Sequence, residues 1–286
     1  MTIAITLKVN DGLVLAADSA STIVVTDELG NAGVINVYNN ANKIFNLIKG
    51  RPIGAITWGG GNIGAASITT LMKDFRQMLT GARPAPVGSQ WQPSATATVE
   101  QVAELAKRFF FDHLYQTAYQ DAHKPPQIGF VIAGYSDQEG MADEYELQIL
   151  SAQECIGPRL IRRREESGFN WYGQIEPITR LVLGYSSDLV KILVEDLNVP
   201  HEQLEPIILL LQQKLSAPLV SPAMPIQDAI DLAEFLVDLA INYARFIPGA
   251  PTVGGPIEIA AITKHEGFKW VRRKHYYDRD LNPKGA

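Results

Sequence analysis

The N-terminal part of the chain alternates between apolar and polar positions, with the period of two that is typical of β-strands. The alternation is clearest over residues 2–9. An Asn-Asp-Gly turn signal follows at 10–12 and leads into a largely apolar segment at 13–18. This arrangement predicts a β-hairpin. A second pair of strands is predicted at 43–47 and 52–58.

Later segments switch between the helical period and the strand period. Helices are predicted over 63–79, 99–122, 188–194, 202–215 and 226–246. Strands are predicted over 128–135, 145–150, 159–163, 169–173, 257–263 and 269–273, with a short strand or connector at 180–184. Strands therefore bracket groups of helices, an order that suits two central sheets between helical layers. One domain is predicted over 1–286, with loop insertions near 22–42 and 81–98.

Composition narrows the class of protein only a little. The chain has 286 residues, 46% of them hydrophobic and 20% charged, as in an ordinary globular protein. Its net charge of -6 gives no reason to expect nucleic acid or an anionic membrane as a partner. The N-terminal segment lacks the basic and apolar regions of a signal peptide, and no apolar run reaches a membrane-spanning length, so a cytoplasmic protein is expected.

Several common kinds of site are disfavoured by the motifs present. The five histidines are scattered, and His201-Glu202-x-x-Glu205 lacks the second histidine of a zinc helix. The single cysteine, Cys155, has no metal-binding spacing, and we expect a buried structural thiol. The basic clusters at 162–164 and 272–274 are expected to be solvated surface. We therefore predict no metal and no cofactor.

One glycine motif allows three interpretations. Gly59-x-Gly61-x-x-Gly64 follows a predicted strand and opens a predicted helix, as a dinucleotide-binding fingerprint would. The second parallel strand of such a unit would fall in the loop near 81–86, which argues against it. A tight strand-to-helix turn is simpler. Backbone N–H groups that present themselves to an oxyanion fit better still.

Thr2 is the most informative candidate for catalysis. A threonine hydroxyl is a poor nucleophile unless a base accepts its proton. An N-terminal α-amine, with a pKa of about 8, is such a base, and on an N-terminal threonine it belongs to the same residue. Thr2 follows Met1 directly, and its small side chain favours removal of the initiator methionine.

The residues that follow Thr2 resemble the start of a proteasome β subunit. Thr2 opens a strand, the turn at 10–12 follows, and Gly12-Leu13-Val14-Leu15-Ala16-Ala17-Asp18-Ser19 places Asp18 at the family's nucleophile-to-aspartate spacing. Asn42-Lys43-Ile44 resembles the catalytic-lysine strand, and the segment 54–60 resembles the strand that ends in the oxyanion-hole glycine, Gly59. Thr252-Val253-Gly254-Gly255-Pro256-Ile257 is similar to the turn before a late strand, especially in the bacterial proteasome-related proteins called Anbu.

This resemblance implies an N-terminal nucleophile (Ntn) hydrolase fold, an α+β, four-layer αββα sandwich of two mainly antiparallel sheets. It implies catalysis by Thr2, Asp18 and Lys43, with Gly59 in the oxyanion hole and no cofactor. In the family, two serines support the N-terminal amine. The first of them corresponds to Gln174 in this sequence, and Thr252 would take the place of the second.

The implied function is a cytoplasmic threonine endopeptidase that cleaves peptides or unfolded proteins. The resemblance further implies a homo-oligomer, whose substrates an ATPase partner would deliver. The alternatives are a non-catalytic or weakly active proteasome-like assembly protein, and an amidohydrolase that acts on small amides.

Overall fold

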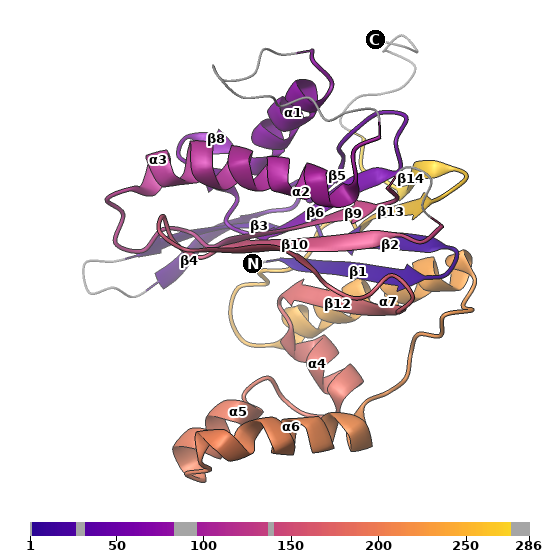
Figure 1. Cartoon of the computed structure of the whole chain (residues 1–286). Coiled ribbons are helices and arrows are strands. Elements are labelled where there is room, and N and C mark those ends of the chain that lie inside the picture. Colours follow the sequence, from indigo (N-terminus) through magenta and orange to yellow (C-terminus); the bar gives the residue numbers. More distant parts are fainter. Residues whose placement is uncertain (1, 27–31, 83–95, 137–139, 276–286) are drawn as a thin grey trace.

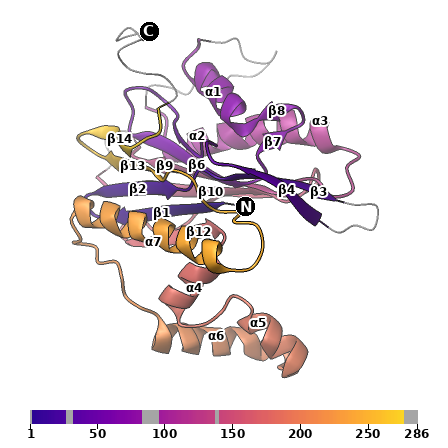
Figure 2. The same cartoon turned by 180° about the vertical axis from the view of Figure 1, so that it is seen from behind.

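Four layers of secondary structure make up the chain (Figure 1). The computed structural model describes residues 2–26, 32–82, 96–136 and 140–275. Two five-stranded sheets lie face to face at the centre, and helices cover the outer face of each, as the view from behind also shows (Figure 2). Every strand pair in the described residues is antiparallel. The predicted αββα sandwich is confirmed.

The first sheet carries the N-terminal hairpin at its centre. Its strand order is β12-β1-β2-β13-β14. The strands are β1 (Ile3–Val9), β2 (Gly12–Ala17), β12 (Gly168–Gly173), β13 (Glu258–Thr263) and β14 (Gly267–Arg272). Ala4 lies opposite Ala17, so the start of β1 and the end of β2 meet at one edge of the layer.

The second sheet has the strand order β11-β10-β9-β6-β5. Its strands are β5 (Ile44–Asn46), β6 (Ile53–Gly59), β9 (Ile128–Gly134), β10 (Asp143–Ile149) and β11 (Cys155–Leu160). Buried side chains from both sheets, among them Leu15, Ile56 and Val131, form the layer between them. Trp58 of β6 stacks on Tyr172 of β12 across this layer, with ring centroids 3.9 Å apart.

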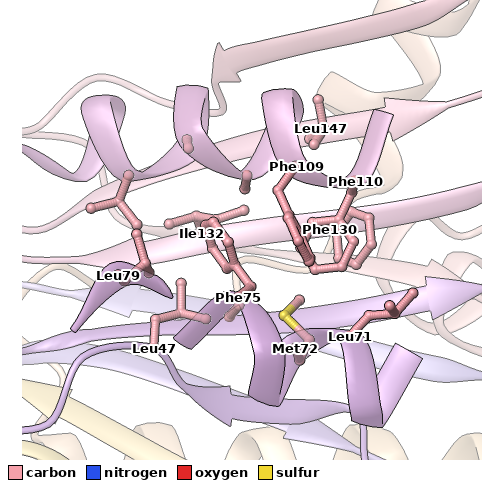
Figure 3. Close-up of a cluster of buried hydrophobic side chains, with 14 of the residues drawn as sticks. Leu47, Leu71, Met72, Phe75, Leu79, Phe109, Phe110, Phe130, Ile132 and Leu147 are labelled. Carbon is pink, nitrogen blue, oxygen red and sulfur yellow. The ribbon is translucent and has the colours of Figure 1, made fainter. Parts of the chain in front are cut away.

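An aromatic core separates the second sheet from its helices. These are α1 (Ile68–Leu79), α2 (Val99–Lys107), the π-helical turn η1 (Arg108–Tyr115) and α3 (Gln116–Tyr119). Phe75 of α1, Phe110 of η1 and Phe130 of β9 interlock there (Figure 3). Fully burying one such ring stabilises the fold by about 1.5–3 kcal/mol, so this layer holds the second sheet firmly in place.

Helix α7 (Ile226–Phe246) covers the first sheet. Small buried residues, including Ala229, Ala233 and Ala240, face the strands and allow a close approach. Beyond it lie α4 (Glu176–Leu183), α5 (Leu189–Lys191), the π-turn η2 (Ile192–Asp196) and α6 (His201–Leu215). Figure 1 shows α5 and α6 set apart from both sheets, and no residue of α6 is buried.

Two predictions of local structure were wrong. The segment 180–184, predicted as a short strand or connector, is the last part of helix α4, which buries Ile178 and Val182 and is capped by Gly184 in the left-handed conformation (φ 77°). The helix predicted from residue 63 starts at 68, where Ser67 caps it by accepting a hydrogen bond from the Thr70 N–H. The two short strands β7 (Asn62–Ile63) and β8 (Ala66–Ser67) occupy the preceding residues.

The two predicted loop insertions have different outcomes. Residues 22–42 hold two paired strands, β3 (Ser21–Thr26) and β4 (Ala32–Tyr38), which extend away from the sheets in Figure 1. Most of the segment 81–98 lies outside the described residues. None of the described helices has the length and apolar character needed to span a bilayer.

Candidate functional site

The N-terminal hairpin brings Thr2 beside Asp18. Because β1 and β2 are antiparallel, the residue before β1 and the residue after β2 meet at one end of the first sheet. The Ile3 N–H donates to Asp18 Oδ1 at 3.0 Å, and the Asp18 N–H donates to the Ile3 carbonyl at 3.3 Å. The spacing between Thr2 and Asp18 is therefore a consequence of hairpin register.

The Asp18 carboxylate is fully buried and accepts four hydrogen bonds. Besides Ile3, the Oδ1 atom accepts from Lys43 Nζ at 2.5 Å. Oδ2 accepts from the backbone N–H groups of Ala20 and Gly254, each at 3.0 Å. A buried carboxylate is costly unless such donors compensate its desolvation, and here three of the four come from segments outside the Asp18 turn. Asp18 therefore ties these segments together.

Lys43 is held in front of Asp18, where β5 begins. Its residue is 5% exposed, and its carbonyl accepts from the Thr57 N–H of β6 at 3.0 Å. Burial lowers the pKa of Lys43 below its usual 10.5, and the Asp18 carboxylate opposes that shift. The sequence predicted a long insertion between Asp18 and Lys43. The hairpin β3–β4 forms most of this insertion, and Lys43 still contacts Asp18.

A cavity of about 410 Å³ joins three of the predicted residues: Thr2, Lys43 and Gly59 all line it. Its walls otherwise come from the Ala20–Thr22 segment, residues 38–42, residues 57–61 at the end of β6, and the start of α1. Asp18 lies behind Lys43, with no exposed surface. A larger hollow of about 500 Å³ beside Tyr172 contains none of the predicted residues.

Gly59 occupies a position that only glycine fits. It ends β6 with a φ of 86°, and a Cβ atom there would lie 2.3 Å from the Gln127 carbonyl oxygen. The adjacent Gly60 N–H donates to that same oxygen at 2.8 Å. The dinucleotide interpretation of this motif is wrong, because the glycines enter the β7–β8 hairpin and the described sheets contain no parallel βαβ unit.

Gln174 and Thr252 lie close to the site without joining the cavity. The Gln174 N–H donates to the Thr2 carbonyl at 2.7 Å, and Gly173 packs against the Thr2 backbone. Thr252 is buried, and its carbonyl accepts from Thr22 Oγ1 at 3.4 Å. Neither residue is among the described residues that line the cavity. The contacts given above are instead made by their backbone groups, the Gln174 N–H and the Thr252 carbonyl.

The structure adds a buried ion pair that the sequence did not predict. Lys274 Nζ lies 2.8 Å from Glu258 Oε2, and the two side chains are 7% and 2% exposed. The expectation of a solvated 272–274 cluster is thus wrong for Lys274. Glu258 was detectable in principle, because it is the only charged residue in the apolar strand β13 and a buried charge needs a partner.

The other basic cluster also differs from its prediction. Arg162 forms an ion pair with the buried Glu144 at 3.3 Å, and Arg164 binds Asp143 at 2.8 Å. Their carboxylates lie inside the protein, at the start of β10. The half-buried thiol of Cys155 has its pKa raised to about 11 by burial. Across the described ranges, no three His, Cys, Asp or Glu side chains are grouped to hold a metal ion.

Comparison with solved structures identifies the fold. The chain resembles the Anbu (Gly-1) mutant from Hyphomicrobium sp. strain MC1, with a TM-score of 0.50 and 16% identity over 96% of this chain and 86% of that one. It also aligns with Anbu (ancestral beta-subunit) from Yersinia bercovieri, with a TM-score of 0.47 and 13% identity over 96% and 88% of the two chains. No family model and no curated protein matches the sequence. The predicted resemblance to Anbu is therefore confirmed at the level of fold.

Proposed function

We propose that this protein is a threonine-type hydrolase that cleaves peptide bonds through the hydroxyl of Thr2. One observation carries the proposal. Thr2, Lys43 and Gly59, which are far apart in sequence, line one cavity, and Asp18 anchors Lys43 from behind. Buried charge beside a candidate nucleophile in a cavity is typical of active sites.

The proposed chemistry begins once the bond between Met1 and Thr2 is cleaved. The freed α-amine of Thr2 accepts the proton of its own hydroxyl, directly or through water, while the Oγ1 atom attacks the carbonyl carbon. Lys43, as a cation, lowers the proton affinity of the nucleophile. The Gly59 N–H stabilises the oxyanion, a contribution of about 3–4 kcal/mol for one such donor.

The tetrahedral intermediate then collapses. The C–N bond of the substrate breaks, and the leaving amine takes the proton held by the α-amine. The acyl group remains on Thr2 as an ester. Water, activated by the same amine, hydrolyses the ester and restores the hydroxyl. No cofactor enters this cycle.

Intact-mass measurement tests the nucleophile directly. We expect the purified protein to lack Met1 and to gain the mass of one peptide epoxyketone, which requires both the amine and the hydroxyl of an N-terminal threonine. The Thr2→Ala variant should fold normally, form no adduct and lose activity on the order of 1,000-fold or more. A protein that retains Met1 after purification, or an adduct that persists in Thr2→Ala, would contradict the assignment.

A non-catalytic assembly protein is the second candidate. It is favoured by Gln174 and Thr252, whose side chains do not reach the cavity wall. A protein that loses Met1 but neither reacts with the epoxyketone nor cleaves peptides and casein would support it. An amidohydrolase for small amides fits the size of the cavity, and would cleave acyl-amide dyes but not casein.

Assembly and location are further parts of the proposal. We propose a homo-oligomer in the cytoplasm, supplied with unfolded substrate by an ATPase. Large apolar side chains exposed on the η2–α6 region support association: Leu197, Leu209, Leu210 and Leu215. Single-particle imaging distinguishes a closed chamber from a small oligomer or a monomer, and a monomer at micromolar concentration would contradict this part.

A further inference from the structure

Four charged side chains, and not two, are buried around the proposed site. Beside the Asp18–Lys43 pair lies the Lys274–Glu258 pair, with 2.8 Å between Nζ and Oε2. Glu258 opens β13 opposite Ala17, the residue before Asp18. Lys274 follows β14. The second pair therefore lies against the turn that carries Asp18.

The ammonium group of Lys274 binds both segments that present the first pair. Nζ donates to Ser19 Oγ and to the Ala41 carbonyl, each at 2.7 Å. Ser19 follows Asp18, and Ala41 precedes Lys43 by two residues. Glu258 Oε2 adds an ion pair to these two hydrogen bonds, although its contact with Nζ is not a well-formed hydrogen bond.

Neighbouring hydrogen bonds extend this connection. The Ala41 N–H donates to the Ser19 carbonyl at 2.9 Å, and Ser19 Oγ donates to the Pro256 carbonyl at 2.6 Å. The Ser19 N–H donates to the Gly254 carbonyl at 2.9 Å. Ser19 thus connects the Asp18 turn, the approach to Lys43 and the approach to β13, and Lys274 binds it where these meet.

We propose that Lys274 and Glu258 are a positioning pair for the Thr2 centre, which holds the Asp18 turn in register with the segment that presents Lys43. The inference rests on the proposed hydrolase function and assigns neither residue a contact with substrate. Lys274 supplies the hydrogen bonds that join the two segments. Glu258 neutralises the ammonium, whose side chain is only 7% exposed.

The second pair also acts electrostatically on Lys43. The Glu258 carboxylate raises the pKa of Lys43, and the Lys274 ammonium lowers it. With both present the two effects oppose each other. Removal of one partner should therefore shift the titration of Lys43 in a direction set by the partner that remains, which a purely structural role would not do.

The test compares Lys274→Met, Glu258→Gln and the double variant with wild type. We expect kcat and the rate of epoxyketone labelling to fall on the order of 10- to 100-fold in each, because small displacements of reacting groups are costly, while KM changes little. The alkaline limb of the pH–rate profile should move to lower pH in Glu258→Gln and to higher pH in Lys274→Met. In the double variant it should return towards its wild-type position.

Two further variants separate positioning from unfolding. Lys274→Arg keeps the charge and several donors and should recover part of the lost rate. Lys269→Met removes an exposed lysine of the same strand region and should leave every rate unchanged. Wild-type rates and an unshifted alkaline limb in Lys274→Met and Glu258→Gln, with the protein folded, would overturn the proposal.

Failure of the proposed function gives a different result. If wild type neither labels nor hydrolyses, the threonine hydrolase assignment fails, and the positioning role is judged by structure and titration alone. A crystal structure of Lys274→Met should then show the Asp18 turn and residues 41–43 moved apart, and NMR should show opposite shifts of the Lys43 titration in the two single variants. An unchanged Asp18–Lys43 contact together with an unchanged titration would overturn the positioning role as well.

Discussion

The two ends of strand β1 each carry a cluster of buried charge, and the clusters differ in their access to a cavity and in their hydrogen bonding. At the N-terminal end, the Asp18 oxygens accept four hydrogen bonds, and Lys43 lies at the wall of a cavity. At the other end, Lys8 is 1% exposed and lies near Glu144 and Asp143, and its Nζ donates to the Arg163 carbonyl at 3.2 Å. The first cluster is joined to a space that a substrate can enter, whereas the second is enclosed.

The enclosed cluster is also less well satisfied. Both carboxylate oxygens of Glu144 lack a well-formed hydrogen bond, although Arg162 forms an ion pair with one of them. Buried charge alone therefore does not identify an active site. What distinguishes the Thr2 end is a complete set of donors around Asp18, together with a cation facing a cavity and a candidate nucleophile. The neighbouring Glu258 does not share this feature, because its Oε2 atom also lacks a well-formed hydrogen bond.

The largest expected effect comes from exchanging one lysine at each end for methionine. Lys43→Met should reduce activity by at least about 100-fold, because the proposed nucleophile, Thr2, loses the cation that lines the same cavity. Lys8→Met should leave the activity of the folded protein unchanged. It should lower the free energy of unfolding by about 3 kcal/mol, because Glu144 keeps a buried charge with fewer partners.

Peptide hydrolysis and urea denaturation of both variants measure the two effects. A large loss of activity in folded Lys8→Met would show that the enclosed cluster also serves the site, and the distinction between the two ends would then fail.

A methyl group at Gly173 tests how tightly the Thr2 end is fitted. A Cβ atom there would lie 1.9 Å from the Thr2 carbonyl oxygen, so Thr2 must move in Gly173→Ala. We expect at least a tenfold loss of activity and a loss of stability of about 2 kcal/mol. Labelling kinetics and thermal unfolding measure them.

Gly50→Ala is the matched control. Gly50 has a similar φ of 83° against 91° at Gly173, but a Cβ atom there meets nothing within 4 Å. It should lose about 1 kcal/mol of stability through backbone strain alone and keep full activity. Equal activity of the two variants would mean that the position of Thr2 is not critical.

The smallest effect is a difference in how pH acts on the two lysines. Burial lowers the pKa of both Lys43 and Lys8 below 10.5. As the pH rises, activity should first increase near pH 8, where the Thr2 amine loses its proton. It should then decrease with a midpoint lower than pH 10.5, where Lys43 becomes neutral.

Over the alkaline range, where activity should decrease with pH, the contribution of these lysines to the free energy of unfolding should increase with pH. Between the lowered folded pKa and 10.5, the folded state binds fewer protons than the unfolded state, so each lysine makes the free energy of unfolding rise with pH. Lys8→Met should flatten that rise and leave the alkaline limb of activity in place. A limb that moves in Lys8→Met would contradict the assignment of the limb to Lys43.

Much of the fold was predictable, because strand and helix periods are local. The hairpin of β1 and β2 and the boundaries of α7 follow from side-chain spacing over a few residues. Helix α4 was missed, because its short apolar stretch at 180–184 matches a strand as well as a helix. The late start of α1 was missed, because glycines at 59–61 mark a turn without fixing which element follows.

The site was predictable only in part. Thr2 is a candidate from the chemistry of an N-terminal threonine, whereas Asp18, Lys43 and Gly59 follow from a family resemblance, and the roles of all four stay predictions. The placement of Lys274 depends on how β13 and β14 pack beside β2, which no local pattern records. The amides of Ile3, Ala20 and Gly254 that surround Asp18 are backbone groups, and the identity of a residue says nothing of where its N–H points.

The bonds of Asp18 also set an order of events during synthesis. Its carboxylate needs an amide from Gly254, and its turn needs the ammonium of Lys274, and the ribosome adds both of these residues long after Thr2. A nascent chain that already exposes Thr2 therefore lacks the groups that would complete the centre around it. The proposed nucleophile would consequently be harmless to neighbouring nascent chains until residues 254 and 274 have been synthesised, and competence would arise only when β13 and β14 have docked beside β2.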